Sequence, residues 1–234
     1  MADGNDLIAA IYDAVIDPSR WNEVVRRIVA ATKSLSGGII TKPPDAIRLS
    51  SLCNIDPTCA EAYIQTYAKM DPLAVLAPAI APGKVRTGTL FSQTDDFKAS
   101  TLHNEFCRPQ GWADVVAVGL VRTPQATGIL NLQRTSDALW VEEPEWHLLE
   151  SLAPQLRRAA QLRQLLSQAR TLTESLGAAV AGAGFAVLLL AGDCRILFAN
   201  TRAEDLLHHG AVLRCEFGRL VAATPALTHR STLS

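Results

Sequence analysis

The chain has 234 residues, of which 48% are hydrophobic and 19% are charged, and its formal net charge is −1. This composition supports a packed core and excludes global disorder and fibrous classes. The balanced charge excludes an overall basic footprint for nucleic-acid binding. Its five cysteines are odd in number and are never spaced C-x-x-C, so we expect reduced thiols in a cytoplasmic protein, with no structural metal and no cofactor.

The first 140 residues alternate amphipathic helices with short apolar runs. This pattern predicts an α+β fold in which helices flank a mainly antiparallel sheet. Residues 123–127 have the length and composition of a hairpin linker between the last two strands. The expected helices cover residues 6–16, 20–32, 57–70 and 95–108, and the expected strands cover 39–41, 47–52, 112–122 and 128–134.

A long helix is expected over residues 144–176, because small or apolar side chains recur there at steps of three and four. Pro154 is expected to kink this helix near its start. The leucine seam favours a dimerisation helix that also carries a signal, and the alternative is a helix packed on its own chain. The candidate dimerisation residues are Leu149, Leu152, Leu156, Leu162, Leu166 and Leu172.

The remaining residues predict a second, smaller unit. Apolar runs at 185–190 and 195–199 flank the turn at Gly192 and Asp193 and indicate a hairpin. A helix over 200–207 and a strand within 213–221 follow, and residues 225–234 are expected to be irregular. Residues 175–192 contain no charge, but their four glycines favour a turn and a buried strand over a membrane span.

One cluster of side chains is typical of a small-molecule site. Tyr63, Tyr67 and Asp71 follow one another at steps of four residues, which places them on one face of a helix. Packed over a sheet that carries Trp112, this face is expected to wall a small apolar pocket with a few polar groups. In the alternative interpretation, Asp71 caps the segment after Pro72 and the tyrosine rings fill the core.

Catalytic signatures are absent from the sequence: it has no G-x-S-x-G elbow, no H-E-x-x-H pair and no phosphate-binding loop. His103 and Cys107 are four residues apart, so a thiol–imidazole pair is conceivable on a helix, although a buried thiol is the simpler interpretation. The arginines of the long helix, which include Arg157 and Arg170, are interpreted as a solvated face and not as a DNA contact. We therefore expect a protein that is not an enzyme.

Several segments together resemble the sensory region of LuxR-type helix-turn-helix transcriptional regulators. They are LIAAIYDAVIDPSRWNEVVRRI, AYIQTYAKMDPL, FCRPQGWADVVAVGL, LNLQR and LLESLAPQLRRAAQL. The later segment GFAVLLLAGDCRILFANTRAEDLL is similar to the opening of a PAS-like domain, with Asn200, Ala203 and Glu204 at a helix start.

The resemblance implies a PAS/GAF-like sensory domain over 1–142, a signalling and dimerisation helix over 143–176, and a partial PAS-like domain over 177–234. It implies a homodimer with a small-molecule effector, no membrane partner, and DNA binding only through a helix-turn-helix domain that this chain lacks. We expect a sensory fragment or a truncated gene product. The alternatives are a ligand-independent decoy that heterodimerises with full-length regulators, and a thiol-dependent enzyme.

Overall fold

The computed structural model describes residues 4–43, 47–124, 126–138, 141–182, 184–210 and 212–223. The chain divides into two compact units, residues 1–165 and 166–234. The long helix α7 (Glu143–Ala181) begins in the first unit and ends in the second. Among the described helices, none combines the length and the apolar character that a bilayer span needs.

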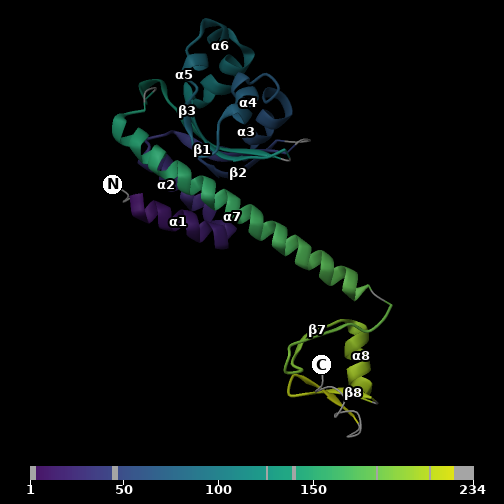
Figure 1. Cartoon of the computed structure of the whole chain (residues 1–234). Helices are drawn as coiled ribbons and strands as arrows, with labels where there is room; N and C mark the ends of the chain where they lie inside the picture. Colours follow the sequence, from purple (N-terminus) through teal and green to yellow (C-terminus); the bar gives the residue numbers. More distant parts are fainter. Residues whose placement is uncertain are drawn as a thin grey trace. The chain divides into compact units, whose positions relative to one another are not determined.

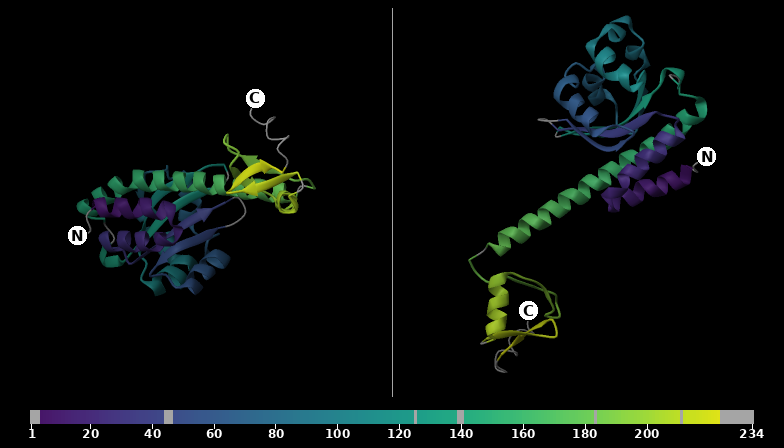
Figure 2. Two further views of the ribbon diagram at one scale, coloured as in Figure 1. Left: turned by 90° about the horizontal axis from the view of Figure 1, so that it is seen from below. Right: turned by 180° about the vertical axis from the view of Figure 1, so that it is seen from behind.

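A five-stranded antiparallel sheet forms the centre of the first unit, in the order β2-β1-β5-β4-β3 (Figure 1). Helices α1, α2 and α7 cover one of its faces, and helices α3 to α6 cover the other (Figures 1 and 2). The strands are β1 (Ser36–Lys42), β2 (Arg48–Cys53), β3 (Val85–Thr87), β4 (Asp114–Arg122) and β5 (Thr127–Arg134). The helices are α1 (Gly4–Ile16), α2 (Trp21–Ala31), α3 (Pro57–Ala62), α4 (Pro72–Leu76), α5 (Thr89–Ser92) and α6 (Asp95–Ala99).

The two faces of the sheet have different roles because side chains alternate along a strand. On β5, Leu130 and Leu132 point into the core formed with α1, α2 and α7. Their neighbours Ile129, Asn131 and Gln133 line a cavity on the opposite face. The period-2 pattern of β5 therefore separates a face that packs in the core from a face that lines the cavity.

The core contains the first part of the leucine seam of α7. Leu149, Leu152 and Leu156 are at most 1% exposed and lie in one cluster with Leu7 and Ile11 of α1. These three leucines are buried by side chains of their own chain, so they are not available to a dimer interface as the sequence predicted. The helical period that buries a seam against a second chain buries it equally well against α1 and α2 of the same chain.

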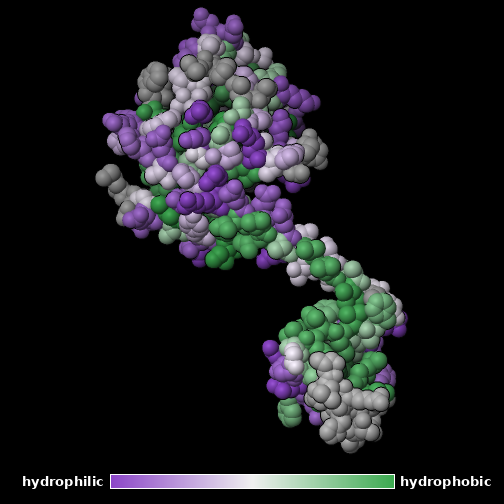
Figure 3. Space-filling model, viewed as in Figure 1, coloured by the Kyte–Doolittle hydropathy of each residue, from purple (hydrophilic) through white to green (hydrophobic). Residues whose placement is uncertain are grey.

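Beyond residue 160 the leucines of the α7 seam are exposed in the part of the chain that the structure describes. Leu162, Leu166, Leu172 and Leu176 are between 44% and 61% exposed. The helix runs without interruption through Pro154, so the predicted kink does not break it. Figure 3 shows apolar residues along the exposed stretch of this helix and on the second unit.

The described residues of the second unit form two hairpins separated by a helix. The first hairpin pairs β6 (Leu188–Leu190) with β7 (Ile196–Ala199), and α8 (Thr201–His209) follows it. Where one strand was expected within 213–221, the chain forms a second hairpin of β8 (Leu213–Glu216) and β9 (Arg219–Ala222). Its two-residue turn has positive φ at Phe217 and Gly218, the geometry of a tight hairpin turn.

Asn200 joins three parts of the second unit and is buried. Its Oδ1 accepts hydrogen bonds from the amides of Val187 and Ala203, and its Nδ2 donates to the carbonyls of Val180 and Phe185. Asn200 thereby caps α8, as its place before that helix in the sequence predicts. It also ties the end of α7 to the first hairpin.

Two other elements differ from those that the sequence predicts. The connection over 78–88 contains β3, the edge strand of the sheet. The helix expected over 95–108 is interrupted at Ser100, whose extended backbone ends α6 and whose hydroxyl bonds the Phe97 carbonyl and the His103 amide. Such local side-chain bonds compete with the helix. The expected irregular tail at 225–234 lies outside the described residues.

Candidate ligand-binding cavity

A cavity of about 350 Å³ lies between the sheet and the helices α3 to α6, inside the first unit. The sheet face opposite the core supplies its floor, with Val115, Ala117 and Ile129 among the apolar residues. Its walls come from the helical layer, where Leu73 and Phe106 are two of the lining side chains. Its volume is within the range of small-molecule pockets.

Aromatic rings form one wall, and Phe106 is at their centre. The Phe106 ring lies 4.7 Å from that of Tyr67 in a stacked arrangement and 5.7 Å from that of Tyr63, measured between centroids. Trp112 meets Phe106 edge-on at 5.4 Å. Phe106 belongs to a π-helical turn, Leu102–Cys107. Phe106 was not among the site residues predicted from the sequence, although it lies six residues before Trp112.

Tyr63 and Asp71 meet in the wall, as the spacing predicts. The Tyr63 hydroxyl donates to Oδ2 of Asp71 at 2.7 Å, and Oδ1 accepts from the Leu73 amide at 2.8 Å. The second bond is the capping role of the alternative interpretation, so Asp71 both caps α4 and lines the cavity. Burial raises the pKa of the Asp71 carboxyl, and burial together with the Asp71 charge raises the pKa of Tyr63.

Tyr67 is placed differently from Tyr63. Its ring packs on Phe106 and does not line the cavity. Residues Tyr63–Tyr67 form a π-helical turn, closed by the bond from the Ala68 amide to the Tyr63 carbonyl. Both tyrosine rings contact Phe106, but only Tyr63 lines the cavity.

Polar groups on the sheet side of the cavity were not selected from the sequence. Asp114 begins β4 and accepts hydrogen bonds from the hydroxyls of Thr89 and Ser92. Asn131 and Gln133 lie on β5, and Gln133 accepts a bond from the Ser36 hydroxyl at 3.0 Å. The alternation in the segment GILNLQR is the signal that would have placed Asn131 and Gln133 on one face.

Cys107 lines the cavity, and His103 lies one turn before it. Burial, with a smaller contribution from the Asp71 charge, raises the pKa of the Cys107 thiol to about 12. The His103 ring packs against Phe97 at 5.5 Å, and its Nδ1 is buried without a hydrogen-bond partner among the described residues. A thiol in this environment stays protonated at neutral pH, which opposes a nucleophilic role.

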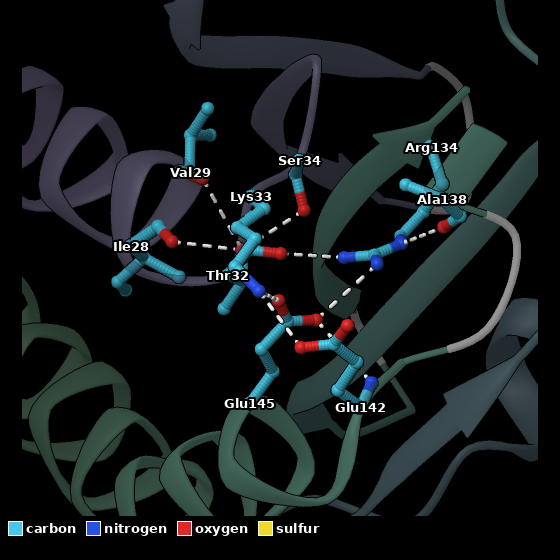
Figure 4. Close-up of polar contacts among 9 residues, drawn as sticks. All are labelled: Ile28, Val29, Thr32, Lys33, Ser34, Arg134, Ala138, Glu142 and Glu145. Atoms are coloured by element: carbon cyan, nitrogen blue, oxygen red, sulfur yellow. Dashed lines mark hydrogen bonds and ion pairs between the residues drawn. The ribbon is translucent and has the colours of Figure 1, made fainter.

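A buried ion pair links the sheet to the start of α7 (Figure 4). Nη2 of Arg134, the last residue of β5, lies 3.2 Å from Oε2 of Glu145 in the first turn of α7. The same guanidinium donates to the carbonyl of Thr32 after α2 and to that of Ala138. Lys33 reaches both Glu145 and Glu142 from the surface. Arg134 adjoins Gln133 in sequence, so β5 contacts the cavity on one face and α7 on the other.

The fold is similar to those of solved sensory domains. The ligand-binding domain of VqsR from Pseudomonas aeruginosa matches with a TM-score of 0.56 and 16% identity, over 68% of this chain and 94% of that one. SdiA from Escherichia coli matches with a TM-score of 0.50 and 13% identity, over 70% and 68% of the two chains.

CepR2 from Burkholderia cenocepacia, an N-acylhomoserine lactone-dependent LuxR family transcription factor, gives a TM-score of 0.48 at 15% identity, over 68% of this chain and 93% of that one. No protein-family model and no curated protein matches the sequence. The likeness to VqsR and SdiA confirms the fold expected from the resemblance to LuxR-type sensory regions. The α+β class, with an antiparallel sheet between helices and a long helix, is confirmed as well.

Proposed function

We propose that this chain is the sensory region of a LuxR-type transcriptional regulator, in which a small molecule bound in the cavity changes the packing of α7. The observation that carries the proposal is the cavity of about 350 Å³, walled by apolar and aromatic side chains, in a fold shared with a ligand-binding domain. Such a region regulates transcription together with a helix-turn-helix domain, in its own polypeptide or in a partner.

Strand β5 supports the proposed route from ligand to helix. Asn131 and Gln133 line the cavity, and Arg134 holds Glu145 at the start of α7. A ligand that shifts β5 therefore acts directly on a buried ion pair. Interactions of this kind favour one of two packings and not a continuous range, because a displaced buried charge loses its partner. Occupancy of the cavity would shift the population of α7 arrangements.

The exposed leucines of α7 support homodimerisation as the output. Leu162, Leu166, Leu172 and Leu176 lie within about 120° of the helix circumference, at ~100° per residue. An apolar stripe of this width on a helix is the kind of surface that a second helix covers. A second copy of the chain presents the same stripe, which is the self-complementary arrangement of a two-fold dimer.

Ligand binding is tested by filling the cavity. Ala117 lies on its floor, and Ala117→Phe would occupy the space that a ligand needs. The wild-type chain is screened by calorimetry against apolar metabolites and then compared with Ala117→Phe and with Ala9→Phe, an exposed position on α1. We expect binding to be lost only in Ala117→Phe. Equal affinity in all three proteins would contradict the assignment of the cavity.

Dimerisation is tested separately by sedimentation equilibrium. The double variant Leu166→Lys with Leu172→Lys is expected to be monomeric where the wild type is dimeric, because two desolvated charges oppose association. Thr171→Lys, an exposed position on the opposite side of the helix, is the matched control and should remain dimeric. A chain that dimerises through these leucines but binds no ligand in any screen would instead be the ligand-independent module that heterodimerises with full-length regulators.

A further inference from the structure

The second unit leaves most of its large apolar side chains uncovered. Among its described residues, Ala203 is the only apolar residue that is buried. Phe185, Leu189 and Leu197 are 70%, 57% and 52% exposed. A small unit is stable only when it buries enough apolar surface, and two-stranded hairpins are marginal in water on their own. The second unit therefore gains stability from a partner that covers these side chains.

Two of the uncovered side chains share one face of the hairpin β6–β7. Leu189 and Phe198 are paired directly across the two strands, and they are 57% and 36% exposed. The next pair, Leu188 and Ala199, is half-buried, as the alternation of side chains along a strand requires. Leu197 is the extra residue where the register shifts. We call the side of the hairpin that carries Leu189 and Phe198 the hairpin face.

The strands that form the hairpin face carry no charge. Strands β6 (LLL) and β7 (ILFA) contain only apolar residues, and the connection between them holds one residue of each sign, Asp193 and Arg195. A charged partner would find no opposite charge on these strands. An identical face meets no like-charge repulsion and offers the same apolar side chains, so this surface suits a second copy of the chain.

The hairpin face follows directly on the exposed stripe of α7. Asn200 bonds the Val180 carbonyl at the end of α7, and it also bonds the Phe185 carbonyl and the Val187 amide before β6. Figure 3 shows apolar residues on the last turns of α7 and on the second unit, on the same face. In a parallel pair of α7 helices, the residues that follow the helix in both copies meet at the same end of the pair.

The stripe of α7 is too short to hold two copies firmly by itself. Residues 162–176 cover about two heptads, whereas a sustained coiled coil extends over about three or four. Before this stretch, Leu156 and Ala159 are buried in the core of the first unit. A stable interface takes about 800 Å² from each partner. The hairpin face supplies apolar surface beyond the point where the stripe ends.

We propose that the hairpin face packs against the hairpin face of a second copy of the chain, and that this contact stabilises the second unit. The inference rests on the homodimer of the proposed function and adds to it an interaction surface outside α7. A partner that binds the folded unit and not the unfolded one stabilises it by mass action. The stability of the second unit therefore depends on the concentration of the chain.

The first test measures hydrogen exchange against protein concentration. The amides of Ala191 and Asn200 bond the carbonyls of Arg195 and Val187, so they report on the hairpin. Sedimentation equilibrium gives the dissociation constant of the dimer. We expect exchange at these amides to slow by about tenfold when the concentration rises from about a tenth of that constant to about a hundred times it. Equal exchange at both concentrations overturns the inference.

Substitutions of Leu189 locate the contact. Leu189→Lys and the uncharged Leu189→Thr both change a side chain that is more than half exposed, so neither opens a gap inside the single chain. We expect the dissociation constant of the dimer to rise by about tenfold in Leu189→Lys and by less in Leu189→Thr. Val212→Lys, 56% exposed just before β8, is the matched control and should dimerise as the wild type does.

The outcomes separate this inference from the proposed function. A dissociation constant that is unchanged in both Leu189 variants overturns the inference and leaves dimerisation through α7 in place. An equal loss of dimer in Val212→Lys also overturns it, because the effect would then not belong to the hairpin face. A wild type that stays monomeric at every concentration refutes the homodimer together with the inference, and binding in the cavity is still measured independently.

Discussion

The guanidinium of Arg134 and the carboxylate of Glu145 lie 3.2 Å apart beneath the sheet, with 2% and 5% of their side chains exposed. This pair joins the strand that lines the cavity to the helix that leaves the domain. It also places a cation at the end of α2 and an anion in the first turn of α7, both of which suit the helix dipoles. The pair therefore links the cavity-lining strand β5 to the start of α7.

Breaking this pair is expected to be costly. Glu145→Gln leaves the Arg134 charge buried without its carboxylate, and we expect a loss of about 3–5 kcal/mol in the free energy of unfolding. Glu150→Gln, an exposed substitution on the same helix, should change it by less than about 0.5 kcal/mol. Urea denaturation followed by circular dichroism measures both. Equal stability of the two variants would show that the ion pair does not hold the start of α7.

The structure explains why the sequence predicted some elements well and others poorly. Strands β4 and β5 and helices α1 and α2 are periodic enough that hydrophobic pattern alone identifies them. Strand β3 has three residues and is held at the sheet edge by β4. Its formation depends on a partner far along the chain, and its own residues carry no periodic signal.

The candidate site shows the same division between local and non-local information. The Tyr63–Asp71 contact follows from spacing within one segment. The position of Tyr67 depends on how its ring packs on Phe106, which belongs to a later segment of the chain. The volume of the cavity depends on small residues such as Ala117, which come from separate segments of the chain. The pattern within any one segment therefore does not predict it. The burial of Leu149 likewise depends on its packing against α1 and α2, and the spacing of leucines in α7 does not predict which helix will cover them.

Asp71 predicts a specific pH dependence. Burial raises the pKa of its carboxyl above the usual 3.8, so the folded chain binds this proton more readily than the unfolded chain. The free energy of unfolding that depends on Asp71 must therefore increase as the pH falls from neutral toward 3.8. Asp71→Asn lacks this titration. Chemical denaturation of both proteins at several pH values should show the wild type gaining stability relative to the variant as the pH falls, and the opposite trend would contradict the burial of this carboxylate.

Thiol reactivity distinguishes the sensory proposal from a thiol-dependent enzyme. With the pKa of Cys107 raised to about 12, its thiolate fraction at pH 8 is on the order of 10⁻⁴. We expect iodoacetamide to modify the exposed Cys215 first and to leave Cys107 unmodified while the chain is folded. Mass spectrometry of proteolytic peptides maps the sites, and Cys215→Ser serves as a control for the fast phase. Rapid, selective modification of Cys107 would revive the enzyme hypothesis.

Asn200 makes a graded prediction for the second unit. Asn200→Asp keeps the oxygen that caps α8 but removes both Nδ2 bonds, which leaves the carbonyls of Val180 and Phe185 without that donor. We expect a loss of about 1–3 kcal/mol in local stability, and a further ~1 kcal/mol in Asn200→Ala, which also loses the cap. Hydrogen exchange at the amides of Val187 and Ala203 should be faster in Asn200→Asp than in the wild type, and faster still in Asn200→Ala. Asn22→Asp, an exposed substitution in α2, is the control for the added charge. If Asn200→Asp protects these amides as well as the wild type does, the donor side of Asn200 does not hold the hairpin to α7.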